Sequence, residues 1–446
     1  MNALWPVLTC LAFGAASPET RADVPQKYLE GLPFPMGDIH EPAFPPRTVS
    51  ITAYGAAGDG SGDFLTIQAA LDAVPDGNRN NVTIFIRAGT YAEKVYITKS
   101  HVTLLGEHRD STLILFAELR EDWNRDHAGS DRGAGVVNID TGVSDITIAN
   151  LTVHNNYGTL HGTTKHQFAI RGAGTRIMLL GCNVIADGGD TVSLWDRDDG
   201  MYYHAECSFE GWVDFVCPRG WCYVTASRFF GHNIPSASIW HDGSGNRDQK
   251  FVIRDSHFDG VPGFPLGRNH LDAAIYLIDC RFSKNMADRP FYRPPSSPRE
   301  WQWGDRHYFS GCHRDSADFP WFGDNLGSAE GAPPADEIGA RWTFGGRWDP
   351  EASMPSLLPY AILPVPRDNA TGIDPAGVRL SWVPGRDARS HRLSFGKANP
   401  PDLRKTIDSP DFFTGPLEPH ATYYWRVDET GGGGRGAASV WCFTTK

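Results

Sequence analysis

The stretches IMLLGCNV (177–184), YYHAECSFEG (202–211), YVTASRFFG (223–231) and FVIRDSHFDG (251–260) share one pattern. In each stretch, a short run of strand-forming residues reaches a small or polar residue, and an apolar residue follows two positions later. The pattern recurs at ITIANLTV (146–153), IYLIDCRF (275–282) and HYFSGCHR (307–314). Its key residues lie 20 to 32 positions apart and are Asn150, Cys182, Cys207, Ser227, Ser256, Cys280 and Cys312. Repeats of this length predict a parallel β-helix, whose loops absorb the variation in length.

Four of these key residues are cysteines: Cys182, Cys207, Cys280 and Cys312. Because a free cysteine packs as a small apolar residue, we expect these four to form a buried ladder rather than a metal site. A disulfide between Cys217 and Cys222 stays open, because their spacing alone does not decide it.

Upstream of the repeats, TIQAALDAVP (66–75) places its apolar residues on one face of a short helix that ends at the proline. We expect this helix to cover the N-terminal end of the solenoid. The preceding GDGSGD (58–63) lacks the Gly-Lys-Ser/Thr of a phosphate loop, so we interpret it as a structural turn.

A second domain is predicted for residues 357–446, where short alternating strands are separated by turn residues. The pattern indicates a small β-sandwich, and the segment resembles a fibronectin type III module. This resemblance places Trp382 in the core and Tyr423 or Tyr424 at the corner-tyrosine position. The glycines at 431–434 are interpreted as a hairpin loop.

The chain has 446 residues, 40% of them hydrophobic and 21% charged, and a formal net charge of −12. This acidic balance argues against a nucleic-acid partner. Residues 1–22, with the apolar stretch at 4–16, are interpreted as a secretory signal, so we expect a secreted or periplasmic protein. Residues 23–46 are interpreted as an N-terminal extension. No later segment is long and apolar enough to predict a membrane span.

Several separate motifs within residues 47–350 resemble the pectin methylesterase (pectinesterase) family, and they follow the family's order. The motifs are DGSGDFLTIQAALDAVP (59–75), TIFIRAGTYAEKVYI (83–97) with Gly89, Tyr91 and Glu93, HQFAIR (166–171), GGDTV (188–192), EGWVDFV (210–216) and PLGRNH (265–270). The resemblance implies a right-handed parallel β-helix that hydrolyses methyl esters of pectin, or of a related esterified polysaccharide, without a metal or another cofactor.

The resemblance also implies the catalytic residues: Asp214 as nucleophile, Asp190 as general acid, Gln167 as oxyanion donor and Arg268 as the residue that holds Asp214. A carboxylate that attacks an ester forms a tetrahedral oxyanion, which an amide donor stabilises. We expect Arg268 to lower the pKa of Asp214 and keep it ionised. Asp190, with fewer compensating charges, would be protonated and donate to the departing methanol.

The spacing of the two aspartates supports this assignment. They are 24 residues apart, about one repeat, so neighbouring coils would present both carboxylates on one face. The alternative is that each aspartate only caps a turn. For Arg268 the alternative is a surface ion pair, with Arg289 and Arg293 as replacements.

Departures from the family's motifs leave the substrate open. Gly189 stands where the family has glutamine, and Asn269 and His270 stand where it has Pro-Trp. A divergent esterase for another acylated sugar and a non-catalytic polysaccharide-binding protein therefore remain alternatives. A polysaccharide lyase is disfavoured, since no acidic Ca²⁺-binding cluster lies near Arg268. We expect His270, Phe215 and Trp240 to bind substrate and the chain to be a monomer, although the sequence leaves the oligomeric state open.

Overall fold

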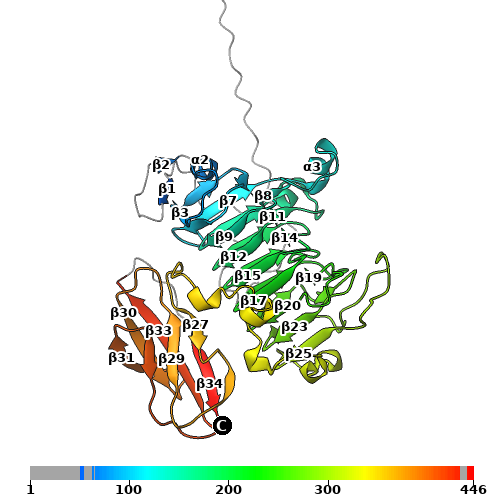
Figure 1. Cartoon of the computed structure of the whole chain (residues 1–446). Coiled ribbons are helices and arrows are strands. Elements are labelled where there is room, and N and C mark those ends of the chain that lie inside the picture. Colours follow the sequence, from blue (N-terminus) through cyan, green and yellow to red (C-terminus); the bar gives the residue numbers. More distant parts are fainter. Residues whose placement is uncertain (1–50, 55–62, 65, 432–438) are drawn as a thin grey trace, which may run out of the picture.

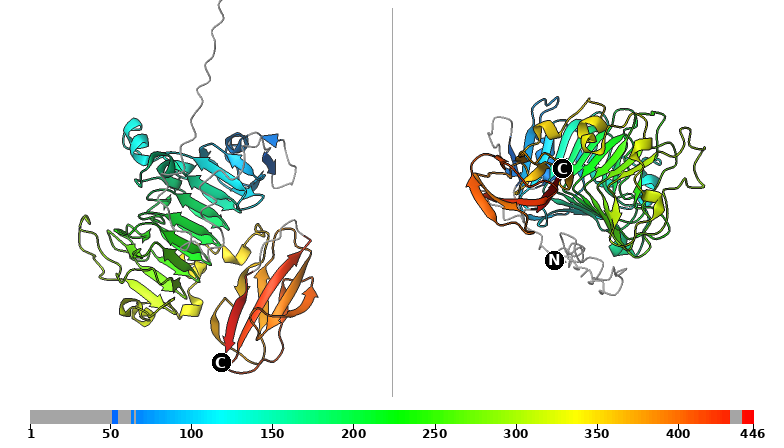
Figure 2. Two further views of the ribbon diagram at one scale, coloured as in Figure 1. Left: turned by 180° about the vertical axis from the view of Figure 1, so that it is seen from behind. Right: turned by 90° about the horizontal axis from the view of Figure 1, so that it is seen from below.

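The computed structural model describes residues 51–54, 63–64, 66–431 and 439–446. The predicted signal peptide, the N-terminal extension, nearly all of the GDGSGD turn and most of the glycine loop lie outside these residues. A right-handed parallel β-helix is followed by a β-sandwich that lies beside its C-terminal half (Figures 1 and 2). The predicted fold class is therefore confirmed.

Three stacked sheets build the β-helix. Sheet A runs β2 (Asp63–Phe64), β1 (Ile51–Tyr54), β3 (Val82–Ile86), β6 (Val102–Gly106), β9 (Ser144–Ala149), β12 (Thr175–Leu180), β15 (Met201–Ala205), β17 (Trp221–Thr225), β20 (Phe251–Arg254), β23 (Ile275–Ile278) and β25 (His307–Ser310). Sheet B runs β26 (His313–Arg314), β24 (Arg281–Phe282), β21 (His257–Gly260), β18 (Arg228–Gly231), β16 (Ser208–Gly211), β13 (Asn183–Ala186), β10 (Thr152–Asn155), β7 (Thr112–Phe116) and β4 (Gly89–Tyr91). Sheet C comprises β14 (Val192–Leu194), β11 (Phe168–Gly172), β8 (Gly135–Ile139) and β5 (Val95–Ile97), with β19 (Ile239–Trp240) and β22 (Gly267–Arg268) farther along.

Neighbouring coils pair in parallel, except that β1 runs antiparallel to β2 and β3 at the N-terminal end. Leu179, His204 and Val224 show the register, because each pairs with the next one coil further on. Such stacking lines the interior with fully buried side chains and removes their apolar surface from water. His204 stands in this apolar interior, where burial lowers its pKa to about 3.

From β9 onward, a tight turn joins each strand of sheet A to the next strand, in sheet B, and we call it the A–B turn. Its central residue takes the left-handed conformation, at Asn150 (φ 55°), Gly181 (57°) and Glu206 (57°) among others. The pairing of Leu180 with Ala149 makes Asn150 equivalent to Gly181 rather than to Cys182. The predicted alignment of Asn150 with the key cysteines is therefore wrong by one residue. The equivalent ladder position is Leu151.

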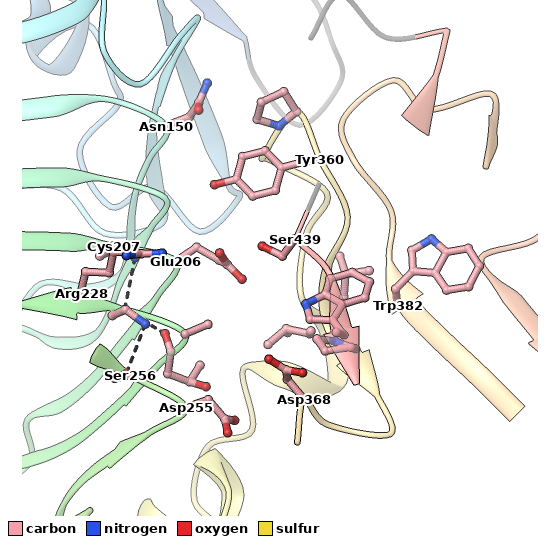
Figure 3. Close-up of a pocket in the computed structure, with 18 of the residues that line it drawn as sticks. Asn150, Glu206, Cys207, Arg228, Asp255, Ser256, Tyr360, Asp368, Trp382 and Ser439 are labelled. Carbon is pink, nitrogen blue, oxygen red and sulfur yellow. Dashed lines mark hydrogen bonds between the residues drawn. The ribbon is translucent and has the colours of Figure 1, made fainter. Parts of the chain in front are cut away.

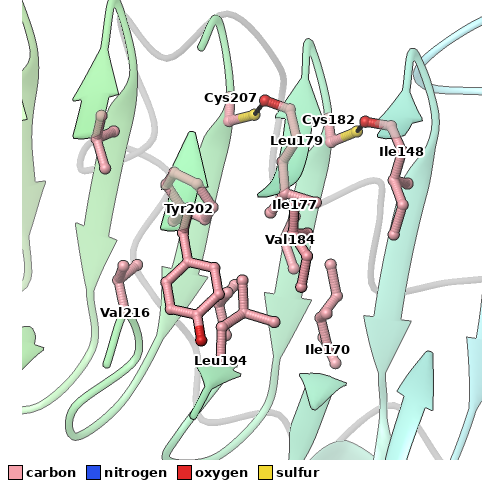
Figure 4. Packing of buried hydrophobic residues seen from close by; sticks show 14 of the residues in the cluster. Ile148, Ile170, Ile177, Leu179, Cys182, Val184, Leu194, Tyr202, Cys207 and Val216 are labelled. Atoms are coloured by element: carbon pink, nitrogen blue, oxygen red, sulfur yellow. Dashed lines mark hydrogen bonds between the residues drawn. The ribbon is translucent and has the colours of Figure 1, made fainter. Parts of the chain in front are cut away.

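The cysteine ladder itself is buried as predicted (Figure 4). Each thiol donates to a carbonyl of the preceding coil: Cys182 to Ile148 at 3.3 Å and Cys207 to Leu179 at 3.4 Å. The seven cysteines of the described residues are all free. Cys217 and Cys222 therefore do not form a disulfide, and the Cys217 thiol lies 2.9 Å from the Ser193 hydroxyl instead.

Short helices cover the ends and the loops of the β-helix. They are α2 (Ile67–Asp72), α3 (Arg120–Asp126), α4 (Tyr157–His161), η3 (Pro320–Phe322), η4 (Leu326–Ser328), η5 (Ala335–Glu337), α5 (Ala340–Thr343) and η6 (Glu351–Ser353). The predicted N-terminal helix is α2, whose buried face packs on the core. Thr66 caps it, and the Glu93 carboxylate accepts from the backbone of Ile67 and Gln68 at 2.9 and 3.1 Å.

The C-terminal sandwich packs two sheets around its own core. One sheet holds β27 (Ile362–Val365), β29 (Arg379–Val383) and β32 (Asp411–Phe413), and the other holds β28 (Ala370–Ile373), β34 (Trp441–Thr445), β33 (Thr422–Thr430), β30 (Ser390–Gly396) and β31 (Leu403–Ile407). Trp382 is 5% exposed in this core, and the Tyr423 hydroxyl accepts from the Glu418 backbone at 2.9 Å. The fibronectin type III identity of this domain stays a prediction.

Candidate active site

The two predicted catalytic aspartates lie where the chain passes from sheet B to sheet C, a connection we call the B–C turn. Asp190 lies between β13 and β14, and Asp214 follows β16 one coil further on. The backbone N–H of Asp190 donates to Val213 at 2.9 Å, and Val192 pairs with Val216, 24 residues later. The structure therefore brings the two aspartates side by side, in register.

Both aspartates are held in an unusual backbone conformation. Their φ angles are 65° for Asp190 and 52° for Asp214, in the left-handed region that few non-glycine residues adopt. Their exposed fractions are only 4% and 5%. Two carboxyl groups buried on neighbouring coils are costly unless cations or hydrogen-bond donors compensate them.

Arg268 supplies that compensation to Asp214, as the sequence predicted. Its Nε lies 3.0 Å from Oδ1 and its Nη2 lies 2.5 Å from Oδ2, a two-pronged ion pair that fixes the carboxylate plane. Strand β22 carries Arg268 and pairs it with Trp240 of β19. The fallback residues point elsewhere, because Arg289 donates to Pro235 and Arg293 pairs with Glu300.

The electrostatics correct one expectation. Burial raises the pKa of Asp214 to about 7, although the Arg268 guanidinium acts in the opposite direction. Burial also raises the pKa of Asp190, against the lowering effects of His166 and Arg120. The predicted net lowering at Asp214 is therefore wrong, because the loss of hydration outweighs one arginine.

Asp190 has a cationic neighbour that the motifs did not reveal. Arg120, the first residue of α3, places Nη1 3.5 Å from Oδ2 of Asp190 and Nε 2.9 Å from Oδ1 of Asp131. Arg120 lies 70 positions before Asp190 in the sequence, on the loop between β7 and β8. No spacing rule of the repeat includes such a loop, so the sequence held no signal for this contact.

Gln167 does not present its amide at the site. Its side chain is fully buried, Oε1 accepts from Gly158 at 2.8 Å, and Nε2 donates to the carbonyls of Thr163 and Lys165 at 3.2 and 3.3 Å. Both amide hydrogens are thus used to hold the 158–165 loop. The geometry does not support the predicted oxyanion role, because a donor already committed to carbonyl oxygens cannot also bind substrate.

The glycine pair before Asp190 has a steric reason. A Cβ on Gly188 would lie 2.0 Å from the Lys165 carbonyl oxygen and 2.5 Å from Gln167 Nε2. A Cβ on Gly189 would lie 2.7 Å from Val213 Cγ1. The chain therefore passes too close to its neighbours for a side chain at Gly188. Because Gly189 has no side chain, no group from this position reaches the space beside Asp190.

The three predicted substrate-binding residues fall in different surroundings. Phe215 is 0% exposed and packs in the interior near Phe229, so its prediction as a substrate contact is wrong: its side chain points inward. Trp240 is 6% exposed and meets the His270 ring edge-on at 5.1 Å. His270 is partly exposed, and burial together with Arg268 lowers its pKa.

A large pocket of the described residues lies away from these groups (Figure 3). It has a volume of about 1320 Å³ and is lined by A–B turn residues and the sandwich, and none of the predicted catalytic residues lines it. Within the described ranges, no three His, Cys, Asp or Glu side chains are grouped to hold a metal ion. No helix of the described chain has the length and apolar character needed to cross a membrane.

Comparison with known proteins shows which proteins part of this chain resembles. Residues 54–232 match the family model described as Pectinesterase. "Probable pectinesterase 30" of Arabidopsis thaliana is 29% identical over 167 residues, which cover 36% of this chain and 30% of that protein. "Pectinesterase QRT1" of the same plant is 32% identical over 166 residues, covering 35% and 42% of the two chains. The chain thus spans less than half the length of these two relatives.

Solved structures match a larger share of the chain. A pectin methylesterase in complex with a hexasaccharide has a TM-score of 0.52 at 17% identity, covering 67% of this chain and 97% of that one. Pectin methylesterase PemA from Erwinia chrysanthemi gives 0.51 at 17% identity, covering 66% and 96%. At these identities the likeness shows the fold. In sequence, residues 54–232 match the Pectinesterase family model, and the chain is similar to curated pectinesterases over about a third of its length.

Proposed function

We propose that this chain hydrolyses the methyl esters of pectin through an aspartyl acyl-enzyme. The observation that carries the proposal is the ion pair of Asp214 with Arg268, set in register beside Asp190. The segment that holds both aspartates is similar to pectinesterases, although Arg268 lies beyond the matched residues. A secreted or periplasmic location is part of the proposal, since pectin is an extracellular polymer.

The contacts of Asp214 and Asp190 suit them to different roles. Arg268 binds both oxygens of Asp214, so it favours the ionised form that a nucleophile needs and fixes its orientation. Arg120 approaches Asp190 only at 3.5 Å, and burial raises the pKa of Asp190. Asp190 is therefore the better proton donor to the leaving methoxide and then the base that activates water.

The test is methanol release from highly methyl-esterified pectin by the full chain. We expect Asp214→Asn to lower kcat by at least about 10³-fold, because an amide cannot form the acyl-enzyme. Asp255→Asn is the matched control, since Asp255 is also a mostly buried, left-handed aspartate with its pKa raised to about 7, but in an A–B turn. Equal methanol release by the wild type and Asp214→Asn would refute the mechanism.

A second candidate rests on the missing amide. Gln167 is committed to its loop and Gly189 carries no side chain, so the rim differs from the motif that the sequence resembles. This difference favours a related ester, such as an acetylated sugar, or binding without turnover. Acetate release from acetylated polysaccharide, measured beside methanol release, separates the esterases. Binding of pectin with neither product would indicate a non-catalytic protein.

A further inference from the structure

Ester hydrolysis at Asp214 needs a hydrogen-bond donor that the predicted residue does not supply. When a carboxylate adds to an ester carbonyl, the oxygen becomes an anion, and a fixed donor stabilises it. Both amide hydrogens of Gln167 are bound to carbonyl oxygens, and Gly189 has no side chain. Another group next to Gly189 must therefore serve if the site is catalytic.

His166 lies at that place. It pairs with Gly189 across neighbouring coils, and its Cδ2 lies 3.5 Å from the position that a Cβ of Gly189 would take. The side chain is 40% exposed, so a substrate can reach it. Its charge lowers the pKa of both Asp190 and Asp214, and it is the strongest cationic influence on Asp190.

The loop that carries α3 holds the ring in place. Nδ1 of His166 lies 2.9 Å from Oε1 of Glu121, and the backbone N–H of Arg120 donates to the His166 carbonyl at 3.0 Å. When Nδ1–H donates to the Glu121 carboxylate, Nε2 carries a hydrogen only in the doubly protonated ring. With the Glu121 carboxylate at Nδ1, Nε2 of the doubly protonated ring can act as a charged donor.

We propose that His166, oriented by Glu121, donates a hydrogen bond from Nε2 to the oxyanion at this site. The inference rests on the proposed esterase function. An Asp214 oxygen forms a bond to the carbonyl carbon, and the carbonyl electron pair moves onto the oxygen that His166 binds. When that pair returns, the bond to methoxide breaks and methoxide takes the Asp190 proton. Water then repeats the addition, loses its proton to Asp190 and releases Asp214.

The experiment uses the full chain and highly methyl-esterified pectin. We expect His166→Ala to lower kcat by about 10²–10³-fold with KM nearly unchanged, the range found for removal of one oxyanion donor. His166→Gln, which keeps a neutral N–H donor, should retain more activity than His166→Ala. Glu121→Gln should fall between the wild type and His166→Ala. His161→Ala is the matched control, because His161 is an exposed histidine of α4 whose ring contacts Tyr157 at a tilt.

The split between kcat and KM separates a donor from a merely structural residue. Charged groups near the His166 ring include Lys165, Glu121, Arg120, Asp190 and Asp214. A donor to the oxyanion acts on kcat and leaves KM nearly unchanged, whereas a residue that only shapes the loop changes substrate binding as well.

The outcomes are distinguishable. An active wild type with an equally active His166→Ala overturns the inference and leaves the proposed function intact. A loss expressed only in KM also overturns it. A wild type inactive on every ester overturns both proposals. Thermal unfolding of each variant identifies misfolding, and His166→Gln together with Glu121→Gln decides the question if His166→Ala does not fold.

Discussion

The A–B and B–C turns flank the same sheet, and both bury carboxyl groups in the left-handed conformation. Glu206 and Asp255 occupy A–B turns with φ of 57° and 48°, and Asp190 and Asp214 occupy B–C turns with 65° and 52°. Burial raises the pKa of Glu206, Asp255 and Asp214 to about 7 in each case. Backbone strain and a raised pKa therefore do not by themselves distinguish an active site from a structural turn.

The two kinds of turn differ in the charged groups that surround their carboxyl groups. Arg268 donates hydrogen bonds to both oxygens of Asp214, which faces Asp190 on the adjoining coil. Glu206 and Asp255 instead face the sandwich across the pocket, where the charge of Asp368 raises their pKa further (Figure 3). An oriented ionic partner, rather than burial alone, therefore distinguishes the carboxylate that can act as a nucleophile.

Removing that partner should give the largest effect. We expect Arg268→Ala to lower kcat on methyl-esterified pectin by about 10²–10³-fold, since Asp214 loses both its orientation and its stabilising charge. Arg268→Lys should recover only part of this loss, because an ammonium group cannot bind both oxygens as a planar fork. Arg228→Ala, at the pocket, is the control and should keep wild-type rates. Equal losses at both arginines would erase the distinction between the two turns.

The pH dependence of the rate sharpens the same comparison. Asp214 must be ionised to attack and its pKa is raised to about 7, so kcat/KM should rise about tenfold per pH unit below that value. Initial rates between acidic and weakly alkaline pH measure this limb. Asp255→Asn should leave the profile unchanged. A profile that is flat through neutrality would contradict the assignment of Asp214 as nucleophile.

The carboxyl groups of the A–B turns should affect the free energy of unfolding rather than the reaction rate. The pKa of Glu206 is raised from 4.5 to about 7 on folding, so the folded state favours the protonated form. That stability is present below pH 4.5 and is lost as the pH rises to about 7. Glu206→Gln should therefore unfold like the wild type at low pH and be about 1–3 kcal/mol more stable at pH 8. Denaturant unfolding measures this, with exposed Glu337→Gln as the control; a gain that does not depend on pH would contradict it.

The sequence alone determined the repeat and therefore much of the site. Parallel coils stack at a fixed register, so a separation of one repeat was enough to predict Asp190 beside Asp214. The buried cysteines followed from the same periodicity. Arg268 was predicted from a family motif, and the structure places it on Asp214.

The contacts that reach the two aspartates from outside the repeat depend on how the whole chain packs. Arg120 and Glu121 arrive on a loop whose length obeys no period, and the fold of that loop selects their contacts. The direction of a side chain was likewise undetermined: Gln167 turns to its own loop and Phe215 turns to the core. A repeat dictates the backbone register because the same hydrogen bonds recur from one coil to the next. Loop contacts and burial depend instead on the whole packed chain.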